Sequence, residues 1–356
     1  MNSRADFDTL APEFQVHIKG EALPTEAAAD LIGVSVLDDV DATGMFTLIV
    51  SGCDADEMKV KWIDDEIFRE GNSVEIAMGY RDNLQTLFSG EITGLEPEFL
   101  EGQPTRLIVR GYDRRHRLLR ERKTRSFTNI KDSEIASQIA ADAGLIPEVD
   151  DSALILPYVL QHNQTDLEFL LARSQRIGFE ALVVGQSLKF REREIKADEM
   201  LVLRREQELL DFRPRLTTTG QVGEFVVHGW NPKDKREIIA FARNGDEKTL
   251  MAGTTSGPRA GEQAFGKAKG SSVTRPVQSQ AEADQMAKQR FSELALDFIR
   301  ADGVCIGEPR LRAGSNVKID GIGTRFSGLY YVTSCEHRYS PRKGYRTSFN
   351  ARRNAS

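Results

Sequence analysis

Cysteine is scarce in this sequence: the 356 residues include three, Cys53, Cys305 and Cys335. An odd number of cysteines without a CxxC pair supplies neither a disulfide framework nor the paired ligands of a structural zinc site. We therefore expect free thiols and a reducing compartment.

Long apolar runs are also missing. No stretch approaches the roughly 18 consecutive apolar residues that a membrane-spanning helix needs. The first residues, Met1 to Asp8, lack the apolar segment of a signal peptide. We expect a protein that is synthesised in the cytoplasm and has no membrane anchor.

The chain has no excess of positive charge. Its 48 lysines and arginines face 54 aspartates and glutamates, which gives a net charge of −6. A chain of this charge is disfavoured as a general binder of nucleic acids or anionic membranes, because both attract basic proteins. Proteins are the favoured partners.

The strongest local concentration of charge is the basic segment, residues 113–125, in which seven arginines and lysines face Asp113 and Glu121. Aromatic side chains that could stack on bases are missing from it, so a nucleic-acid-binding strip is disfavoured. A solvated connector, or a contact with acidic segments such as residues 38–41 of a neighbouring subunit, is favoured. We expect no direct nucleic-acid specificity.

The apolar fraction, 40%, is large enough for sizeable cores, and the length predicts two or three domains. Alternation of apolar and polar residues predicts strands, whereas apolar residues three to four apart predict helices. The predicted segments are a β region over 14–113, a helical region over about 116–200, strands over 223–242, a mobile glycine-rich loop or linker over 252–280, a helix over about 281–300 and a β region over 303–353.

Two helices of the second segment carry terminal signals. Asp132 is predicted to cap a helix that ends at Gly144. Thr165 and Glu168 form a T-x-x-E capping box at the start of the next helix, and Gly178 provides the left-handed residue at its end. The apolar stripe of that helix is typical of a buried core.

The first and last β regions contain similar short motifs in the same order. The motif pairs are Glu13-Phe14-Gln-Val16-His17 and Glu224-Phe225-Val-Val227-His228; Gly71-Asn-Ser-Val74-Glu-Ile76 and Gly314-Ser-Asn-Val317-Lys-Ile319; and Phe88-Ser89-Gly90 and Phe326-Ser327-Gly328. Their collinearity predicts two related β-barrels in one chain. Chance similarity between β-rich segments is the alternative.

We therefore predict a mainly β fold with α+β accessory regions. The predicted domains are a first β-barrel over 1–115, an α+β accessory domain over 116–205, a second β-barrel over 206–242 plus 303–353, and an inserted loop-and-helix segment over 243–302. The duplication places Phe14 and Phe225, Val74 and Val317, and Phe88 and Phe326 on equivalent strands. Gly90 and Gly328 are predicted to hold bends that need an unusual backbone angle or the close approach of another chain.

Motifs for catalysis or metal binding are missing. Residues 261–268 resemble a phosphate-binding loop, but Ala268 replaces the hydroxyl that would bind magnesium. The five histidines are scattered and form no metal-binding pair. Cys335 and His337 share a strand face, but a thiol nucleophile would need a third, orienting group. We predict no catalytic, cofactor-binding or metal site.

Three groups of residues carry a resemblance to a known family. They are Gly111-Tyr112-Asp113 to Leu119 with Asp132-Ser-Glu-Ile135-Ala136; Gln161 to Leu170, including Asp166 and Phe169, with Gly178-Phe179; and Gly307 to Phe349, including His337. Jointly they resemble the phage late control D family. That family covers baseplate hub proteins of contractile tails and the hub portion of VgrG spikes in type VI secretion and related injection systems.

The resemblance implies a tail-hub or VgrG-like architecture. Hubs of this family are homotrimers in which each chain supplies two barrels, so three chains form a pseudo-sixfold ring that docks on a hexameric inner tube. The implied partners are the inner tube protein, a spike or tip protein and other baseplate proteins. The implied location is the baseplate of an assembled phage tail or injection particle.

VgrG-type chains continue into an oligonucleotide-binding-type barrel and a β-helical needle, whereas this sequence ends at Ser356. The resemblance thus implies either the phage type, with its spike tip on a separate polypeptide, or a sequence cut at that boundary. The expected function is a non-enzymatic hub that joins tube to spike and templates tube assembly. The alternatives are a baseplate-associated cell-wall hydrolase and a monomeric two-domain adaptor.

Overall fold

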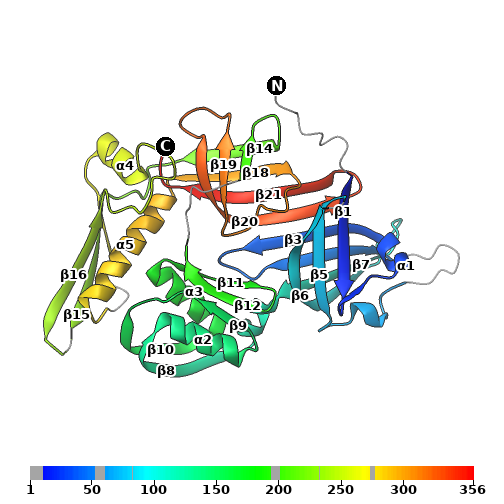
Figure 1. The fold of residues 1–356 in the computed structure, drawn as a ribbon, viewed down its shortest axis with the longest axis horizontal. Helices are drawn as coiled ribbons and strands as arrows, with labels where there is room; N and C mark the ends of the chain where they lie inside the picture. Colours follow the sequence, from blue (N-terminus) through cyan, green and yellow to red (C-terminus); the bar gives the residue numbers. More distant parts are fainter. Residues whose placement is uncertain (1–10, 53–60, 82, 194–200, 232, 273–276) are drawn as a thin grey trace.

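One large sheet contains strands from both ends of the chain. The computed structural model describes residues 11–52, 61–81, 83–193, 201–231, 233–272 and 277–356, so Cys53 lies outside the described residues. The sheet has 13 strands and joins the red and orange strands of Figure 1 to the blue and cyan ones. Its strands are β1 (Pro12–Ile18), β2 (Glu21–Ala22), β3 (Leu31–Asp39), β4 (Met45–Ser51), β5 (Ser73–Tyr80), β6 (Asn83–Glu98), β7 (Arg106–Asp113), β13 (Leu201–Arg204), β14 (Leu209–Leu216), β18 (Ile299–Ile306), β19 (Asn316–Asp320), β20 (Gly328–Ser340) and β21 (Gly344–Arg353).

Two smaller lobes are inserted into this sheet along the chain, and each has its own buried core. The α+β lobe follows the 3-10 helix η3 (Arg114–Leu119) and contains β8 (Arg122–Lys131), α2 (Asp132–Asp142), β9 (Ile146–Val149), β10 (Ile155–Thr165), α3 (Asp166–Ile177), β11 (Phe179–Val184) and β12 (Ser187–Glu192). The distal lobe contains β15 (Glu224–Asn231), β16 (Arg236–Arg243), α4 (Gly257–Phe265), β17 (Lys269–Ser272) and α5 (Gln280–Leu296). Short helices α1 (Thr25–Ala29) and η2 (Glu66–Phe68) decorate the first strands.

The large sheet is built from two six-stranded units with the same strand order. Unit 1 has the order β3-β4-β7-β6-β5-β1, and unit 2 has the order β14-β18-β21-β20-β19-β13. When each unit's strands are numbered along the chain, both orders become 2-3-6-5-4-1. One pairing differs, because β13 runs parallel to β19 whereas β1 runs antiparallel to β5.

Two β-bulges of unit 1 have counterparts in unit 2, whereas the shift between Ile76 and Ala77 in the β5–β6 pair has none. The bulge between Ile92 and Gly94 on β6 recurs between Val332 and Ser334 on β20, an offset of 240 residues. The bulge between Leu31 and Gly33 on β3 recurs between Leu209 and Asp211 on β14, an offset of 178 residues. Bulges are conserved within fold families, so two matching bulges together with the same strand order favour a duplicated unit over two unrelated sheets.

The predicted repeat motifs fall partly in register. Val74 lies opposite Gly90, and Val317 lies opposite Tyr330, so the valine pair is equivalent in the two units. The Phe-Ser-Gly motifs are displaced by two residues, because the equivalent of Phe88 is Gly328 and Phe326 lies in the turn before β20. This motif pair does not mark equivalent positions.

The predicted equivalence of Phe14 and Phe225 is wrong. Phe14 lies on β1 of the large sheet, whereas Phe225 lies on β15, which pairs with β16 and β17 in a separate sheet. Residues 224–242 therefore do not contribute to unit 2, and β13 and β14 take the expected place. The physical reason is that α5 covers the β15–β16 sheet and buries Phe225 and Val227 in a core of its own.

Three further expectations need correction. The two units are not separate barrels, because β20 of unit 2 pairs directly with β3 of unit 1. The glycine-rich stretch is not a linker, because α4 and β17 fold within it; Ser256 caps α4 and Pro258 stands in its first turn. Asp132 is not a helix cap, because its carboxylate binds Arg173 on α3.

The capping box of α3 is confirmed. The hydroxyl of Thr165 accepts a hydrogen bond from the backbone N–H of Glu168 at 3.2 Å, and the backbone N–H of Thr165 donates to the Glu168 carboxylate at 3.0 Å. Gly178 ends the helix with φ of 80°.

Gly90 and Gly94 provide a matched test of the packing in unit 1. A Cβ atom on Gly90 would lie 2.3 Å from the carbonyl oxygen of Tyr112, whereas a Cβ atom on Gly94 would meet nothing within 4 Å. We expect Gly90→Ala to lower the free energy of unfolding by about 2 kcal/mol or more, because the overlap must push β6 away from β7. Gly94→Ala should change it by less than about 1 kcal/mol. Urea unfolding of both variants measures the difference, and equal effects would contradict the close approach at Gly90.

Candidate functional site: assembly surfaces and their buried supports

The motif residues at the end of β7 are structural supports. Asp113 is buried and accepts hydrogen bonds from the backbone N–H of Gly44 at 2.6 Å and from Arg115 Nε at 2.9 Å. Arg115 is 1% exposed and donates to the carbonyl oxygen of Asp39 at 2.9 Å. A Cβ atom on Gly111 would lie 2.1 Å from the carbonyl oxygen of Glu91. These contacts hold η3 against the turn between β3 and β4.

Most basic side chains of the basic segment pair with carboxylates of their own chain. The buried carboxylate of Glu91 receives hydrogen bonds from Arg117 Nε at 3.0 Å and pairs with His116 Nε2 at 2.9 Å. Burial alone would raise the pKa of Glu91, but the hydrogen bonds from Arg117 and His116 outweigh it and lower that pKa. The segment also binds residue 39 of its own chain, through Arg115. Much of the basic segment therefore binds carboxylates and carbonyl oxygens of its own chain.

Gln161 and Asp166 belong to a second buried polar network. Gln161 is fully buried and donates from Nε2 to Asp166 Oδ1 at 2.9 Å. Arg125 donates to Gln161 Oε1 and to Asp166 Oδ1, each at 2.8 Å, and Lys123 donates to Asp166 Oδ2 at 2.7 Å. Because every carboxylate oxygen has a partner, the network fixes β8 and β10 against the start of α3.

The other motif residues of the α+β lobe, Phe169 and Gly178, lie at packing contacts within the chain. Phe169 stacks on Phe127 with ring centroids 5.9 Å apart and an interplanar angle of 9°. Gly178 faces α5, where a Cβ atom would lie 2.3 Å from Gln289 Oε1. The sequence resemblance therefore follows residues that stabilise the fold.

His337 is buried on β20 at the junction of the two units, opposite Val36 of β3. Its Nδ1 lies 2.8 Å from Tyr345 Oη, and its Nε2 lies 2.9 Å from the carbonyl oxygen of Leu311. Burial, with the positive charge of Arg312, lowers the pKa of His337 to about 3. Burial raises the pKa of the Cys335 thiol, whose Sγ lies 3.6 Å from His337 Nε2. A neutral imidazole beside a protonated, buried thiol is a packed core pair, not an activated nucleophile.

His337 should make the stability fall as the pH falls. Its pKa in the folded protein is well below the value of about 6.5 expected in the unfolded chain, so the unfolded state binds a proton first. The loss should begin near pH 6.5 and continue toward pH 3, at about 1.4 kcal/mol per pH unit. We expect His337→Gln to be less stable at pH 7 but to lose less stability between pH 6 and pH 4.

Urea unfolding at a series of pH values measures this slope. His228→Gln is the control, because His228 lies on the outer surface of β15, where its side chain is 41% exposed. An unchanged slope in the His337 variant would show that the buried imidazole does not control the acid response.

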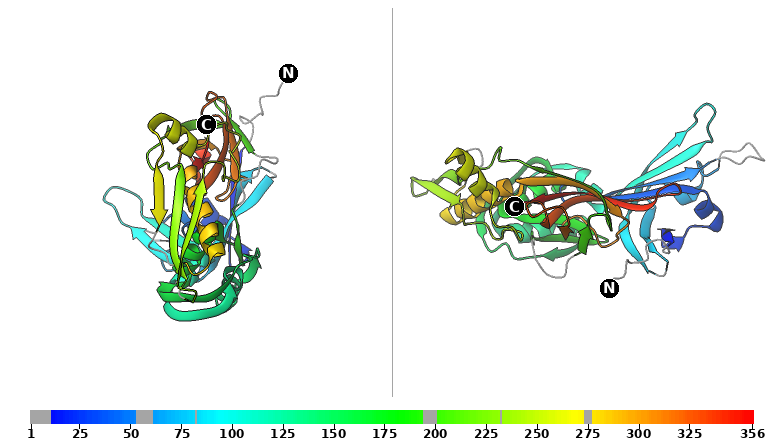
Figure 2. Two further views of the ribbon diagram at one scale, coloured as in Figure 1. Left: turned by 90° about the vertical axis from the view of Figure 1, so that its left-hand side faces the viewer. Right: turned by 90° about the horizontal axis from the view of Figure 1, so that it is seen from above.

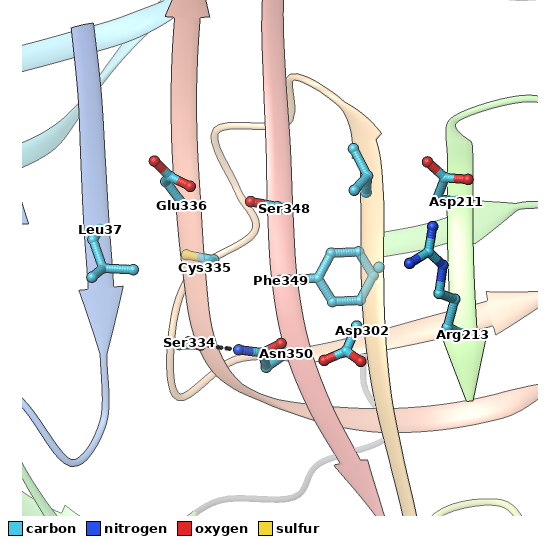
Figure 3. Close-up of a pocket in the computed structure, with 12 residues that line it drawn as sticks. Leu37, Asp211, Arg213, Asp302, Ser334, Cys335, Glu336, Ser348, Phe349 and Asn350 are labelled. Atoms are coloured by element: carbon cyan, nitrogen blue, oxygen red, sulfur yellow. Dashed lines mark hydrogen bonds between the residues drawn. The ribbon is translucent and has the colours of Figure 1, made fainter. Parts of the chain in front are cut away.

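A hollow of about 300 Å³ crosses five adjacent strands of the sheet (Figure 3). Its walls carry Asp211 and Arg213 of β14, Asp302 of β18 and Glu336 of β20, and Asn350 donates to Ser334 Oγ at 2.9 Å on its floor. Within the described parts of the chain, no group of three or more His, Cys, Asp or Glu side chains is arranged to hold a metal ion. The hollow is a trough of mixed polar and apolar lining on the sheet surface, and the thiol that lines it is the buried, protonated Cys335 described above.

Exposed apolar side chains gather on three surfaces. The hairpin tip between β6 and β7 carries Phe99 and Leu100, and this hairpin extends away from the sheet in Figure 2. The other two are the outer face of β10, with Ile155, Tyr158 and Leu160, and the outer face of the β15–β16 sheet, with Trp230, Ile239 and Phe241. Clustered exposed apolar side chains are typical of protein interfaces. None of these three surfaces is evident from the sequence, because an exposed apolar face alternates in the same way as a buried one.

No described helix is long and apolar enough to cross a membrane.

Comparison with solved structures shows the class of this fold. The chain is similar to the 43 kDa tail protein of prophage MuSo2 from Shewanella oneidensis, with a TM-score of 0.71, 14% identity and coverage of 96% of this chain and 98% of that one. It is also similar to a tail protein of Neisseria meningitidis MC58, with a TM-score of 0.69, 11% identity and 96% coverage of both chains. A type VI secretion component of E. coli, c3393, has a TM-score of 0.63 at 13% identity, over 96% of this chain and 77% of that one. The fold is that of tail proteins.

The sequence itself matches a family model over nearly its whole length. That model, described as the Alg8 N-terminal domain, covers residues 8–340, and the chain belongs to this family. No curated protein matches the chain.

Proposed function

We propose that the protein is the structural hub of a contractile phage tail or injection system, of the late control D type. In this proposal three copies form a ring that adapts a hexameric inner tube to a trimeric spike and templates tube assembly. The observation that carries the proposal is the duplicated six-stranded unit with its coincident bulges. The similarity of the fold to phage tail proteins and to the type VI component c3393 supports it.

The duplication suits a change of symmetry. A hexameric tube presents six equivalent positions, and a closed ring must repeat one contact around its axis. Three chains with two similar units each supply six similar positions at one end. The α+β lobe and the distal lobe occur once per chain, so they keep threefold symmetry for the spike and the surrounding baseplate.

The exposed apolar surfaces fit this role. A protein that works inside an assembled particle buries such surfaces against partners. The outer faces of β10 and of the β15–β16 sheet lie on the two inserted lobes, away from the large sheet (Figure 1). They are our candidates for contacts with the spike and with other baseplate proteins. The proposed role is non-enzymatic and places the protein in the assembled particle.

The mass in solution tests the ring. Three copies of the 39.8 kDa chain weigh about 119 kDa, and an obligate ring should bury on the order of 2,000 Å² or more at each interface. Light scattering at tens of micromolar, alone and with the tube protein, should give the threefold mass. A mass of one chain under both conditions would favour the monomeric adaptor.

The rival function is hydrolysis of cell walls. A hydrolase would clear a suspension of purified peptidoglycan, whereas a hub leaves its turbidity unchanged at concentrations where the ring is complete. Lysozyme in the same assay is the positive control. Clearing by the purified chain would overturn the non-enzymatic role.

A further inference from the structure

The junction between the two units provides a template for contacts between chains. Within one chain, β3 of unit 1 adds to the second half of β20, with Asp38 opposite Cys335 and Val34 opposite Tyr339. β19 pairs with the first half of β20, and β3 pairs with the second half of β20 on that same side. Tyr339 then packs on Phe14 of β1 at 4.8 Å. A strand and an aromatic tip thus join unit 1 to unit 2.

Among the described residues, no strand adds to the equivalent backbone edges of the duplicated unit. The equivalent of β20 is β6, and on its β5 side the backbone pairing ends at Ile92. Among the described residues, Gly94–Glu98 pair with β7 alone. The equivalent of β3 is β14, which is the terminal strand of the sheet; it pairs with β18, and among the described residues the one further bridge is from its first residue, Leu209, to Arg205. In the described structure, the second half of β6 (Gly94–Glu98) therefore has no strand neighbour on its β5 side. We call this segment the open half of β6. The edge of β14 that faces away from β18 is likewise open to strand addition.

The offsets fixed by the bulges give the register of a contact between these edges. Subtracting 240 converts β20 residues into β6 residues, and adding 178 converts β3 residues into β14 residues. Applied to the β3–β20 pairs, these offsets oppose Leu95 to Leu216, Glu96 to Arg215, Pro97 to Pro214, Glu98 to Arg213 and Phe99 to Phe212.

The residues brought together are chemically complementary. Leucine meets leucine and phenylalanine meets phenylalanine on one face of the pair, while glutamate meets arginine twice on the other face. Phe99 is 63% exposed in the single chain. Cross-strand apolar pairs and opposite charges both stabilise antiparallel strands. The offsets come from the positions of backbone bulges alone, so side-chain chemistry played no part in choosing the register. The complementarity of the side chains is therefore an independent observation.

The prolines limit the contact to this short segment. Pro97 and Pro214 oppose each other, and neither has an N–H to donate. Prolines on edge strands disfavour indiscriminate pairing between sheets. The contact must therefore draw its affinity from the apolar and charged pairs on both sides of the prolines.

We propose that β14 of one copy adds antiparallel to the open half of β6 of a second copy, with Leu95 opposite Leu216 and Glu98 opposite Arg213. The hairpin tip then packs its Phe99 on the neighbouring unit 2, as Tyr339 packs on unit 1 within the chain. Repeated around a threefold axis, the contact makes a closed ring of six units. The proposal rests on the trimer proposed above and assigns the strands that close it.

Intermolecular crosslinking tests the register. In a Cys53→Ser background, the variant Leu95→Cys with Leu216→Cys should form disulfide-linked species of two and three chains under mild oxidation, because directly opposed strand residues have the Cα separation that a disulfide needs. The control pairs Thr93→Cys with Leu216→Cys and should crosslink at least fivefold less. Equal yields from the two variants, or none from the first, would overturn the register.

Charge reversal provides a second readout. Glu98→Arg or Arg213→Glu should raise the protein concentration at half assembly by roughly tenfold, and the double variant should restore it. Glu148→Arg, on β9 of the α+β lobe, carries the same charge change as a control. A trimer that neither crosslinks nor responds to reversal overturns this proposal alone, whereas a chain that stays monomeric at all concentrations overturns the trimer as well.

Discussion

The antiparallel pairing of β3 with β20 is the contact on which the shape of the whole chain depends. It joins the two duplicated units into one sheet, and around it Arg312 binds Asp38 at 3.1 Å and donates to the carbonyl oxygen of Leu87 at 2.7 Å. Tyr80 donates to the carbonyl oxygen of Gly307 across the same junction. Because backbone pairing, charge and side-chain packing coincide here, contacts within the chain hold the two units in one sheet.

The same geometry explains where the insertions lie. The distal lobe enters between β14 and β18, and the α+β lobe enters between β7 and β13, so both leave the sheet at connections between strands. Added length at such a connection costs little closure entropy, about 0.6 kcal/mol for each doubling. The lobes can therefore carry partner surfaces without disturbing the repeated order of the strands.

Much of this architecture follows from the sequence, and the limits have physical causes. Local residue spacing can be read directly from a sequence. It predicts the capping box at Thr165, the β regions and the repeat at Val74 and Val317. The place of β13 and β14 in unit 2 could not be predicted, because β13 has only four residues and pairs parallel to β19. Residues 224–242 match the start of unit 1 as a motif, yet α5 gives them a separate core.

The proposed partner surfaces are harder to predict than the fold for a related reason. The residues that carry the family resemblance, such as Asp113, Gln161 and His337, are buried and hydrogen-bonded within the chain, so they record what the fold requires. An edge that pairs only with another copy has an ordinary alternating pattern. Such an edge is recognised by comparison with the equivalent edge of the other unit, because the β3–β20 pairing shows the same kind of contact within one chain.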